Sequence, residues 1–437
     1  MAAPTKSWLE EAGRWAPALS ERIDPVAWHA VGMSGSRRFV IVGASLAGAK
    51  AAETLRKDGF DGDVVLVGEE GERPYERPPL SKEYLRGEAG PDKLFVHKEG
   101  YYDAAGIEPR LGQTVTGIDV EGHAVELASG ERLPYDSLLL TTGARPRPLS
   151  LPGADLDGVH YLRTMASSAS LRDAIRGASR VAVIGAGWIG CEVAASARQM
   201  GAEVVMVELA DLPLQRVLGP EVGRFYRDVH AGHGVELHFG VATESLVGSR
   251  SVEGVRLAGG GTLPADVVVV GVGAAPATEL AEKAGIEVEN GVVTDEFLQT
   301  SRPGIFAAGD VANAFHPLFG ARARVEHWAN ARNQGPVAAR NMLGKGRPYV
   351  RVPYFYSDQY DISMEYSGYA PAWDEVVLRG DVASHVFMAF WLKDGLVAAG
   401  MNVNIGDAAG KISDLVQSRR VVDKAKLADP DVSLADV

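Results

Sequence analysis

Cysteine is almost absent from this sequence of 437 residues, which contains only Cys191. A single cysteine excludes a disulfide within the chain and a cysteine-rich metal site, and it fits a reducing cytoplasm. It also excludes a redox-active cysteine pair, because thiol–disulfide exchange within one subunit needs two sulfur atoms. We interpret Cys191 as a small buried residue, and we predict no metal site.

Long apolar runs and basic residues are also scarce. No run of about 18 apolar residues is present, so we expect no transmembrane helix and no membrane partner. The formal net charge of −13 argues against a nucleic-acid partner, because phosphate binding needs clustered lysine and arginine. Residues 1–37 read as an N-terminal extension without an apolar signal core. In it, Ser7 and Glu10 have the spacing of a capping box, which indicates a short amphipathic helix.

The clearest motif lies between residues 181 and 209. An apolar strand is followed by Gly185, Gly187 and Gly190 in G-x-G-x-x-G spacing, at the start of a helical pattern. The first glycine permits a sharp turn, the second lets a pyrophosphate approach the backbone, and the third lets the helix pack on the strand. The phosphates would lie at the helix N-terminus. The motif therefore predicts a dinucleotide site.

An acidic residue follows this motif at the expected distance. The strand at residues 204–207 ends in Glu208, roughly 20 residues after Gly185, where an acid binds a ribose hydroxyl. This carboxylate would repel a 2'-phosphate, and residues 209–211 supply no arginine to receive one. The pattern favours NAD over NADP.

A similar unit occurs nearer the N-terminus. Its motif is Gly43, Ser45 and Gly48, in which serine is small enough to allow close approach of a phosphate. A helix is expected at residues 47–57, and Glu69 follows the next strand. Two such βαβ units predict an α/β fold that binds two dinucleotides.

The segment at residues 72–85, ERPYERPPLSKEYL, is rich in proline and basic residues. Its prolines predict an extended chain. Arg77 and Lys82 would bring positive charge near the first nucleotide site, although a solvated basic loop is the alternative.

Three further segments contain glycine at the end of an expected strand. They are TTGARP at residues 141–146, GVGAAP at 271–276 and IFAAGDVA at 305–312. Each would bring backbone close to a nucleotide, with Gly273 in the second segment. Asp310, directly after the last strand, could accept hydrogen bonds from a polyol.

In this order the motifs resemble those of two-dinucleotide flavoprotein reductases. Within that group, RPYERPPLSKEYL and YFYSDQYD are similar to segments of the FAD-dependent NADH:ferredoxin reductases that serve cytochromes P450 and aromatic-ring dioxygenases. Rubredoxin reductase and apoptosis-inducing factor are also similar. The resemblance implies two Rossmann-like dinucleotide-binding domains, one for FAD and one for NADH, and a C-terminal α+β domain, arranged as in glutathione reductase. It divides the chain into an FAD-binding domain at 38–150 and 270–346, an NAD-binding domain at 151–269 and a C-terminal domain at 347–437.

The resemblance also implies the residues of both sites. For FAD they are Gly43, Ser45, Ala47, Gly48, Glu69, Arg77, Lys82, Val115, Arg145, Asp310, Trp328 and Tyr356. For NAD they are Gly185, Gly187, Ile189, Gly190, Glu192, Glu208 and Gly273. Lys82 matches a lysine beside the flavin ring, and Glu192 matches an acid near the nicotinamide that can pair with it. These two are the expected catalytic residues.

The implied reaction is hydride transfer from NADH to FAD, followed by transfer of single electrons to a ferredoxin-type iron–sulfur protein that serves a P450 or a Rieske oxygenase. An acidic ferredoxin would bind a basic patch. The candidates for this patch are Arg322, Arg324, Arg332, Lys411, Arg419, Arg420, Lys424 and Lys426. For the last five, a solvated helix face is the alternative.

One departure from the family leaves the acceptor open. Tyr356 stands where many ferredoxin reductases have a tryptophan, which leaves a different carrier, oxygen or a quinone as alternatives. A rubredoxin reductase, or an NADH-sensing flavoprotein that reoxidises slowly and dimerises when reduced, is the alternative function, so a homodimer is left open. An oxidase using a cysteine sulfenate is disfavoured, because Cys191 lies in the NAD motif.

Overall fold

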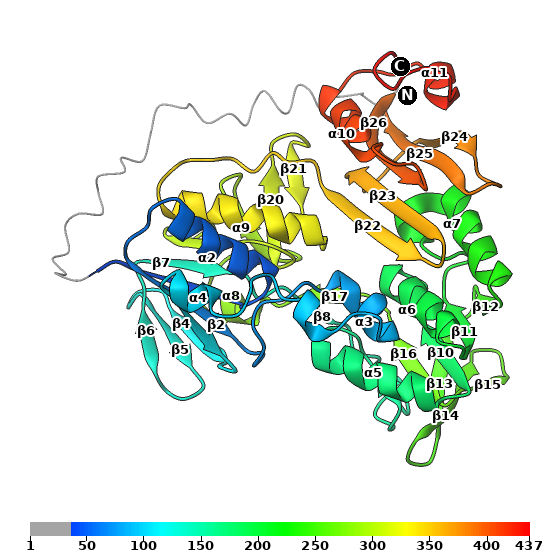
Figure 1. Ribbon diagram of the computed structural model, residues 1–437, viewed down its shortest axis with the longest axis horizontal. Helices are drawn as coiled ribbons and strands as arrows, with labels where there is room; N and C mark the ends of the chain where they lie inside the picture. The colour runs from blue at the N-terminus through cyan, green and yellow to red at the C-terminus, as the bar shows by residue number, and fades with distance from the viewer. Residues whose placement is uncertain (1–35) are drawn as a thin grey trace, which may run out of the picture.

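The computed structural model describes residues 36–437, so the helix expected near residue 7 lies outside the described residues. Figure 1 shows two sheets with flanking helices, built from chain in blue to yellow, and a third sheet with the C-terminal helices in orange and red. This arrangement confirms the α/β class. Between residues 36 and 437, no helix has the length and apolarity needed to cross a bilayer.

The first sheet consists of five parallel strands. In spatial order they are β3 (Ile107–Leu111), β2 (Asp63–Gly68), β1 (Arg38–Val42), β7 (Ser137–Leu140) and β19 (Ile305–Ala307). Both faces of the sheet are covered, which explains why β1 reads as a continuous apolar run.

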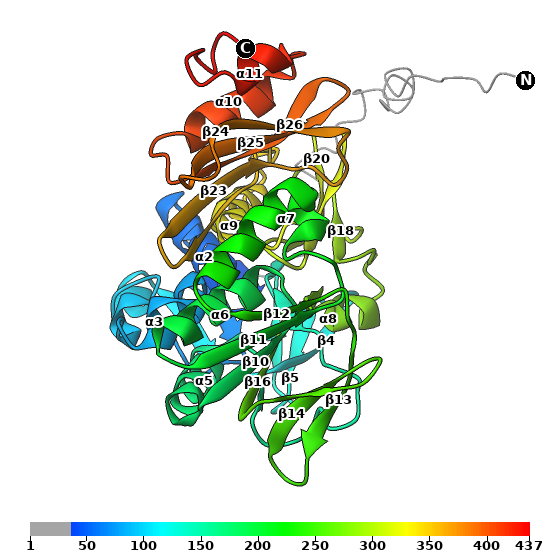
Figure 2. The same ribbon diagram turned by 90° about the vertical axis from the view of Figure 1, so that its right-hand side faces the viewer.

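Alternate residues of β1 point to opposite faces of the first sheet. Phe39 and Ile41 pack in one apolar cluster with residues of α2 (Leu46–Lys57) and α9 (Trp328–Met342), which lie side by side in Figures 1 and 2. Val40 packs in a different cluster, together with antiparallel strands that cover the other face of the first sheet. Those strands are β4 (Val115–Asp119), β5 (Ala124–Leu127) and β6 (Arg132–Pro134).

The second sheet repeats this plan with five parallel strands. In spatial order they are β12 (Glu236–Phe239), β11 (Glu203–Glu208), β10 (Arg180–Ile184), β16 (Val267–Val270) and β9 (Val159–His160). Its helices are α5 (Met165–Gly177), α6 (Trp188–Gln199) and α7 (Gln215–Gly232). Helix α7 is broken at Gly219, which has φ 78° and precedes Pro220, so its first turn is offset from the remainder.

The third sheet is antiparallel and packs against the second unit. In spatial order its strands are β22 (Tyr354–Gln359), β23 (Ile362–Gly368), β26 (Leu396–Val403), β25 (Val386–Lys393) and β24 (Glu375–Asp381). Trp391 is fully buried in the cluster that joins this sheet to α6 and α7, and its Nε1 donates to the Leu218 carbonyl oxygen at 3.1 Å. The opposite face packs on α10 (Ala409–Ser418) through Ile412.

The remaining elements are short connections and small sheets. The strands are β8 (Ala144–Pro146), β13 (Thr243–Gly248), β14 (Val252–Leu257), β15 (Thr262–Pro264), β17 (Ala274–Pro276), β18 (Val292–Thr294), β20 (Ala312–His316) and β21 (Ala321–Ala323). The helices are α3 (Glu83–Arg86), α4 (Tyr101–Ala104), α8 (Glu279–Lys283) and α11 (Lys424–Ala428), with the 3-10 turns η1 (Pro78–Ser81) and η2 (Pro91–Lys93).

The prediction of an extended chain in the proline-rich segment was wrong over part of its length. Pro78 and Pro79 begin the 3-10 turn η1, and α3 follows directly. Proline tolerates the first turn of a helix because the amide hydrogens there have no partner within the helix. The turn brings Ser81 and Lys82 into the interior, where they are 2% and 5% exposed.

Candidate functional site

The second glycine motif forms the floor of a large groove. Gly185 has φ 96°, and a Cβ on Gly190 would lie 2.0 Å from the Gly185 carbonyl oxygen, so the first and third glycines allow the turn and the helix contact. A Cβ on Gly187 would meet no heavy atom of residues 36–437 within 4 Å, so the second glycine faces open space. The groove holds a cavity of about 640 Å³, which Gly185, Gly187, Ile189, Glu208 and Gly273 help to line.

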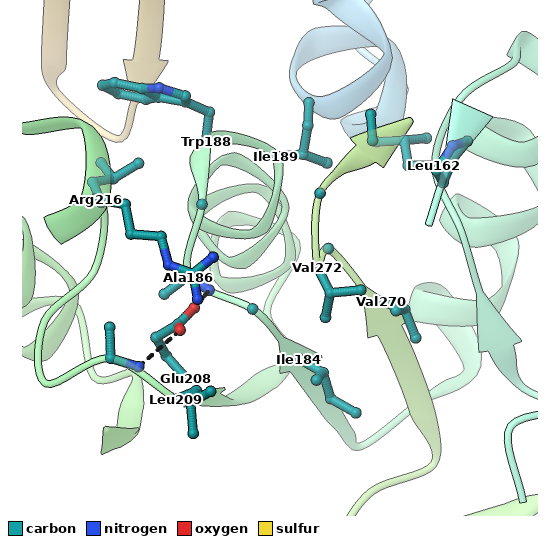
Figure 3. Close-up of a pocket in the computed structure, with 18 of the residues that line it drawn as sticks. Leu162, Ile184, Ala186, Trp188, Ile189, Glu208, Leu209, Arg216, Val270 and Val272 are labelled. Carbon is teal, nitrogen blue, oxygen red and sulfur yellow. Dashed lines mark hydrogen bonds between the residues drawn. The ribbon is translucent and has the colours of Figure 1, made fainter. Parts of the chain in front are cut away.

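Glu208 lies at the end of β11 beside the start of α6 (Figure 3). Its Oε2 accepts a hydrogen bond from the Ala186 amide at 2.7 Å, and its Oε1 accepts one from the Ala210 amide at 2.9 Å. These bonds fix the carboxylate while leaving further acceptor capacity on both oxygens. Such a fixed acceptor in a groove suits a ribose hydroxyl.

Arg216 is a groove residue that the sequence reasoning missed. It lies on the first turn of α7 and lines the groove, and Figure 3 shows its side chain extending toward Ala186 and Glu208. Nothing in the sequence places Arg216 beside Glu208, because the break at Gly219 and the fold of the loop between β11 and α7 are not visible in it. The guanidinium places positive charge beside the acid.

A second cavity, of about 240 Å³, adjoins the groove. The two cavities share lining residues, among them Ser81, Ile189 and Asp310. The start of α2, with Ser45 and Ala47, opens into this second cavity, and the Ser45 side chain makes no capping bond among the described residues. The backbone amide hydrogens at the start of α2 therefore have no side-chain cap, and they suit a phosphate.

Lys82 and Glu192 meet in this second cavity, as expected. Lys82 Nζ lies 2.7 Å from Glu192 Oε2, and both side chains are more than nine-tenths buried. Hydroxyl groups of Ser81 and Ser357 also donate to the carboxylate. The Lys82 ammonium lies 5.7 Å from the ring centre of Tyr356. A buried pair with this many hydrogen bonds presents a fixed, nearly neutral charge distribution to any ligand in the cavity.

Other expected FAD residues divide between the cavity lining and positions away from it. Arg77, Asp310, Trp328 and Tyr356 line the cavity. Burial raises the pKa of Tyr356 to about 12, so its phenol stays protonated at neutral pH. Asp310 is held by Arg163, whose guanidinium lies 3.1 Å from it; the sequence reasoning did not select this arginine.

Glu69, Arg145 and Val115 do not line either cavity. Arg145 pairs with Glu69 at 3.2 Å, with both side chains more than three-fifths exposed. The Val115 side chain is buried under the first sheet. Gly43 and Gly48 allow segments of backbone to approach each other closely. A Cβ on Gly43 would lie 2.1 Å from the Thr141 carbonyl oxygen, and a Cβ on Gly48 would lie 2.2 Å from the Gly43 carbonyl oxygen.

The donor set of the second cavity fits FAD. It offers a helix start without a side-chain cap for phosphate, the Asp310 carboxylate for a polyol, and Arg77 and Lys82 as cations.

Cys191 takes no part in either cavity. It lies in α6, fully buried, and its Sγ lies 3.6 Å from the Ala186 carbonyl oxygen. Burial raises the pKa of this thiol well above its usual range, which keeps it protonated and unreactive. The interpretation of Cys191 as a packing residue agrees with this environment.

Comparisons with known proteins find relatives along almost the whole chain. Residues 37–335 match the family described as pyridine nucleotide-disulphide oxidoreductase, and residues 354–437 match a reductase C-terminal domain. The ferredoxin–NAD(+) reductase component of the anthranilate 1,2-dioxygenase system of Burkholderia cepacia is 40% identical over 400 residues, which cover 91% of this chain and 98% of the relative.

Two solved structures are similar along almost their whole length. The ferredoxin reductase for the CYP199A2 system of Rhodopseudomonas palustris has a TM-score of 0.88 and 38% identity, covering 92% of this chain and 100% of the other. The covalent complex of putidaredoxin reductase with putidaredoxin gives a TM-score of 0.89 and 35% identity, covering 92% of this chain and 98% of the other.

Proposed function

The chain belongs to the pyridine nucleotide-disulphide oxidoreductase family, and from this membership we propose that it is an FAD-dependent NADH:ferredoxin reductase. One observation carries the proposal: a nucleotide groove adjoins a second cavity in which the buried Lys82–Glu192 pair lies. The family's name refers to disulfide chemistry, which this chain cannot perform within one subunit because it has only one cysteine.

FAD would be held in the second cavity. The start of α2 receives its phosphates and Asp310 its polyol chain, and Arg77 and Lys82, each paired with a carboxylate, supply hydrogen-bond donors. The chemistry supplied by a bound FAD is acceptance of a hydride from NADH and release of electrons one at a time. The protein contributes position, exclusion of water and a fixed local charge.

NADH would be held in the groove over the second glycine motif. Glu208 accepts from the ribose hydroxyls, and the open space at Gly187 admits the pyrophosphate near Arg216. The lining shared by the two cavities, including Ile189, brings the nicotinamide end of the nucleotide to their boundary. Binding in this way supplies the orientation that hydride transfer requires.

The electron acceptor would be a ferredoxin-type iron–sulfur protein. The support is that one structural relative was solved as a complex with putidaredoxin and that other relatives serve dioxygenase systems. Near the second cavity, the Arg332 guanidinium lies 4.9 Å from the ring centre of Trp328, at the start of α9. An exposed arginine there would attract an acidic carrier.

Anaerobic stopped-flow absorbance tests the proposal. The purified yellow protein is mixed with NADH and then with a panel of oxidised ferredoxins and rubredoxin. We expect rapid bleaching of the flavin band, then fast and salt-sensitive reoxidation by a ferredoxin. Slow reoxidation by every carrier would favour an NADH-sensing flavoprotein instead, and absence of flavin would contradict both functions.

A further inference from the structure

Glu192 is the end of a buried hydrogen-bond chain that extends well beyond the two cavities. Ser357 Oγ donates to Glu192 Oε1 at 2.7 Å, and Gln359 Nε2 donates to Ser357 Oγ at 3.2 Å. His230 Nε2 lies 3.0 Å from Gln359 Oε1, and His230 Nδ1 lies 3.2 Å from the Tyr360 hydroxyl. Ser357, Gln359 and His230 are at most 2% exposed.

The chemistry of the side chains fixes the direction of this chain. An amide oxygen can only accept, so the proton of His230 lies on Nε2, and Nδ1 accepts from Tyr360. Each group therefore donates to the next one toward Glu192. Aligned donors polarise one another in a low-dielectric interior and stabilise negative charge at the end of the chain.

The far end of the chain is anchored on α7. His233, one turn after His230, stacks on the Tyr360 ring with the ring centres 3.7 Å apart. Tyr360 lies in the tight turn between β22 and β23 with φ 57°, a conformation that an aromatic residue adopts only when its surroundings hold it. The two histidines thus hold the hairpin that carries Ser357 and Gln359.

We propose that Ser357, Gln359 and His230 are positioning residues that hold Glu192 as the charged partner of Lys82. The inference rests on the proposed function, because the pair matters through the flavin whose cavity it lines. Burial supports the required neutral state of the histidine, since it lowers the pKa of His230 to about 4. Without the Ser357 hydroxyl, Glu192 can turn away from Lys82 or take up a proton, and in either case it neutralises the Lys82 ammonium less well.

The first test measures the midpoint potential of the flavin in the holoprotein by anaerobic titration with a reference dye. Uncompensated positive charge favours the reduced form, so we expect Ser357→Ala and Gln359→Leu to shift the potential to more positive values, with the larger shift for Ser357→Ala. Ser357→Thr, which keeps a hydroxyl, should restore the wild-type value.

The matched control is Ser168→Ala. Ser168 is fully buried and donates to the Leu80 carbonyl oxygen at 2.7 Å. The alanine variant therefore loses a buried hydrogen bond of comparable length that does not involve Glu192. We expect the wild-type potential from this variant. A potential that is unchanged or more negative in Ser357→Ala and Gln359→Leu would overturn the proposal, even if both variants were less stable.

A second measurement does not depend on any variant or on turnover. Histidine ring ¹⁵N NMR of the wild-type holoprotein should show His230 as the neutral Nε2–H tautomer at pH 7. The Nδ1–H tautomer or a protonated ring would overturn the direction of the chain. Absence of FAD from the protein would contradict the proposed function. Normal reduction by NADH, together with an unaltered flavin potential in the variants, would contradict only the positioning role of Ser357, Gln359 and His230.

Discussion

At the scale of single residues, Glu208 combines a structural and a binding role. Its oxygens accept from the amides of Ala186 and Ala210, and they face the groove. We expect Glu208→Ala to weaken NADH binding about 10- to 100-fold, because a hydrogen bond to a charged group contributes roughly 1.5–3 kcal/mol. The measurement is a direct titration of the oxidised holoprotein with a non-reducing NADH analogue.

The matched control for this prediction is Glu203→Ala. Glu203 begins the same strand, β11, on an exposed position outside the groove lining. Wild-type affinity is expected from it. Equal affinity in Glu208→Ala and the wild type would contradict the assignment of the groove to NADH.

His230, which is fully buried, and His327, which is half-buried, predict how stability depends on pH. Burial lowers the pKa of His230 to about 4, and it lowers the pKa of His327 to about 4 as well. Both pKa values are below the unfolded value of about 6.5, so the unfolded chain binds more protons between these pH values. Stability should therefore fall as the pH falls from about 6.5 to about 4, by about 3 kcal/mol for one such histidine.

Urea denaturation across this pH range tests the sign and the origin of the effect. In His230→Gln, which does not titrate, the free energy of unfolding should change less steeply with pH than in the wild type. Parallel curves for the two proteins would show that His230 is not buried in its neutral form.

At the scale of elements, the crossing of α2 and α9 depends on Gly335. A Cβ on this residue would lie 2.3 Å from the Ala47 carbonyl oxygen. Gly335→Ala should force the helices apart and cost roughly 1–3 kcal/mol of stability. Since Ala47 lines the FAD cavity, the variant should also lose FAD more readily. Thermal unfolding and the FAD:protein ratio after gel filtration measure the two effects.

Gly177, at the end of α5, provides the matched control. A Cβ there would meet no heavy atom of the described chain within 4 Å. Gly177→Ala should be neutral or stabilise by up to about 1 kcal/mol, because it only restricts the unfolded chain. Destabilisation by both alanines to the same degree would show that helix contact is not the cause.

Many elements could be predicted from the sequence because their apolar patterns are local. The strands β1, β10 and β11, the helices α2 and α6, and the glycines of both motifs follow from such patterns. The 3-10 turn at Pro78 was not predicted, because proline fits both an extended chain and a first helical turn. The domain boundaries and the roles of the site residues stay predictions.

The contacts that complete the site were beyond the sequence because they join distant residues. Ser357 and Glu192 are 165 positions apart, and Arg163 and Asp310 are 147 apart. No local pattern reports such a pair. Buried polar residues such as Gln359 are the available indication once burial is known, since each needs a partner.

At the scale of the whole molecule, the net charge of −13 makes local positive charge decisive for an acidic carrier. Arg332 is exposed near the FAD cavity, whereas Lys424 already pairs with Glu375 on β24. We expect Arg332→Glu to raise the KM for ferredoxin at least several-fold at low salt, and less at high salt. Lys424→Glu should change it little.

Steady-state assays with ferredoxin, and stopped-flow reduction by NADH alone, measure this effect. The rate of reduction by NADH should be unchanged in both variants, because neither residue lines the groove. A larger effect of Lys424→Glu than of Arg332→Glu would place the carrier against α11 instead.

The order of strands in the first sheet also bears on how the chain is made. β19 pairs with β7, yet Ser137, the first residue of β7, and Gly304, the residue before β19, are 167 positions apart. All strands of the second sheet lie between them in the sequence. A ribosome therefore releases the whole second sheet before the first can close. During synthesis, the edge of β7 that pairs with β19 stays without its partner strand, and an unpaired strand edge of this kind promotes aggregation. This edge of β7 should accordingly stay exposed until residue 307 has left the exit tunnel of the ribosome.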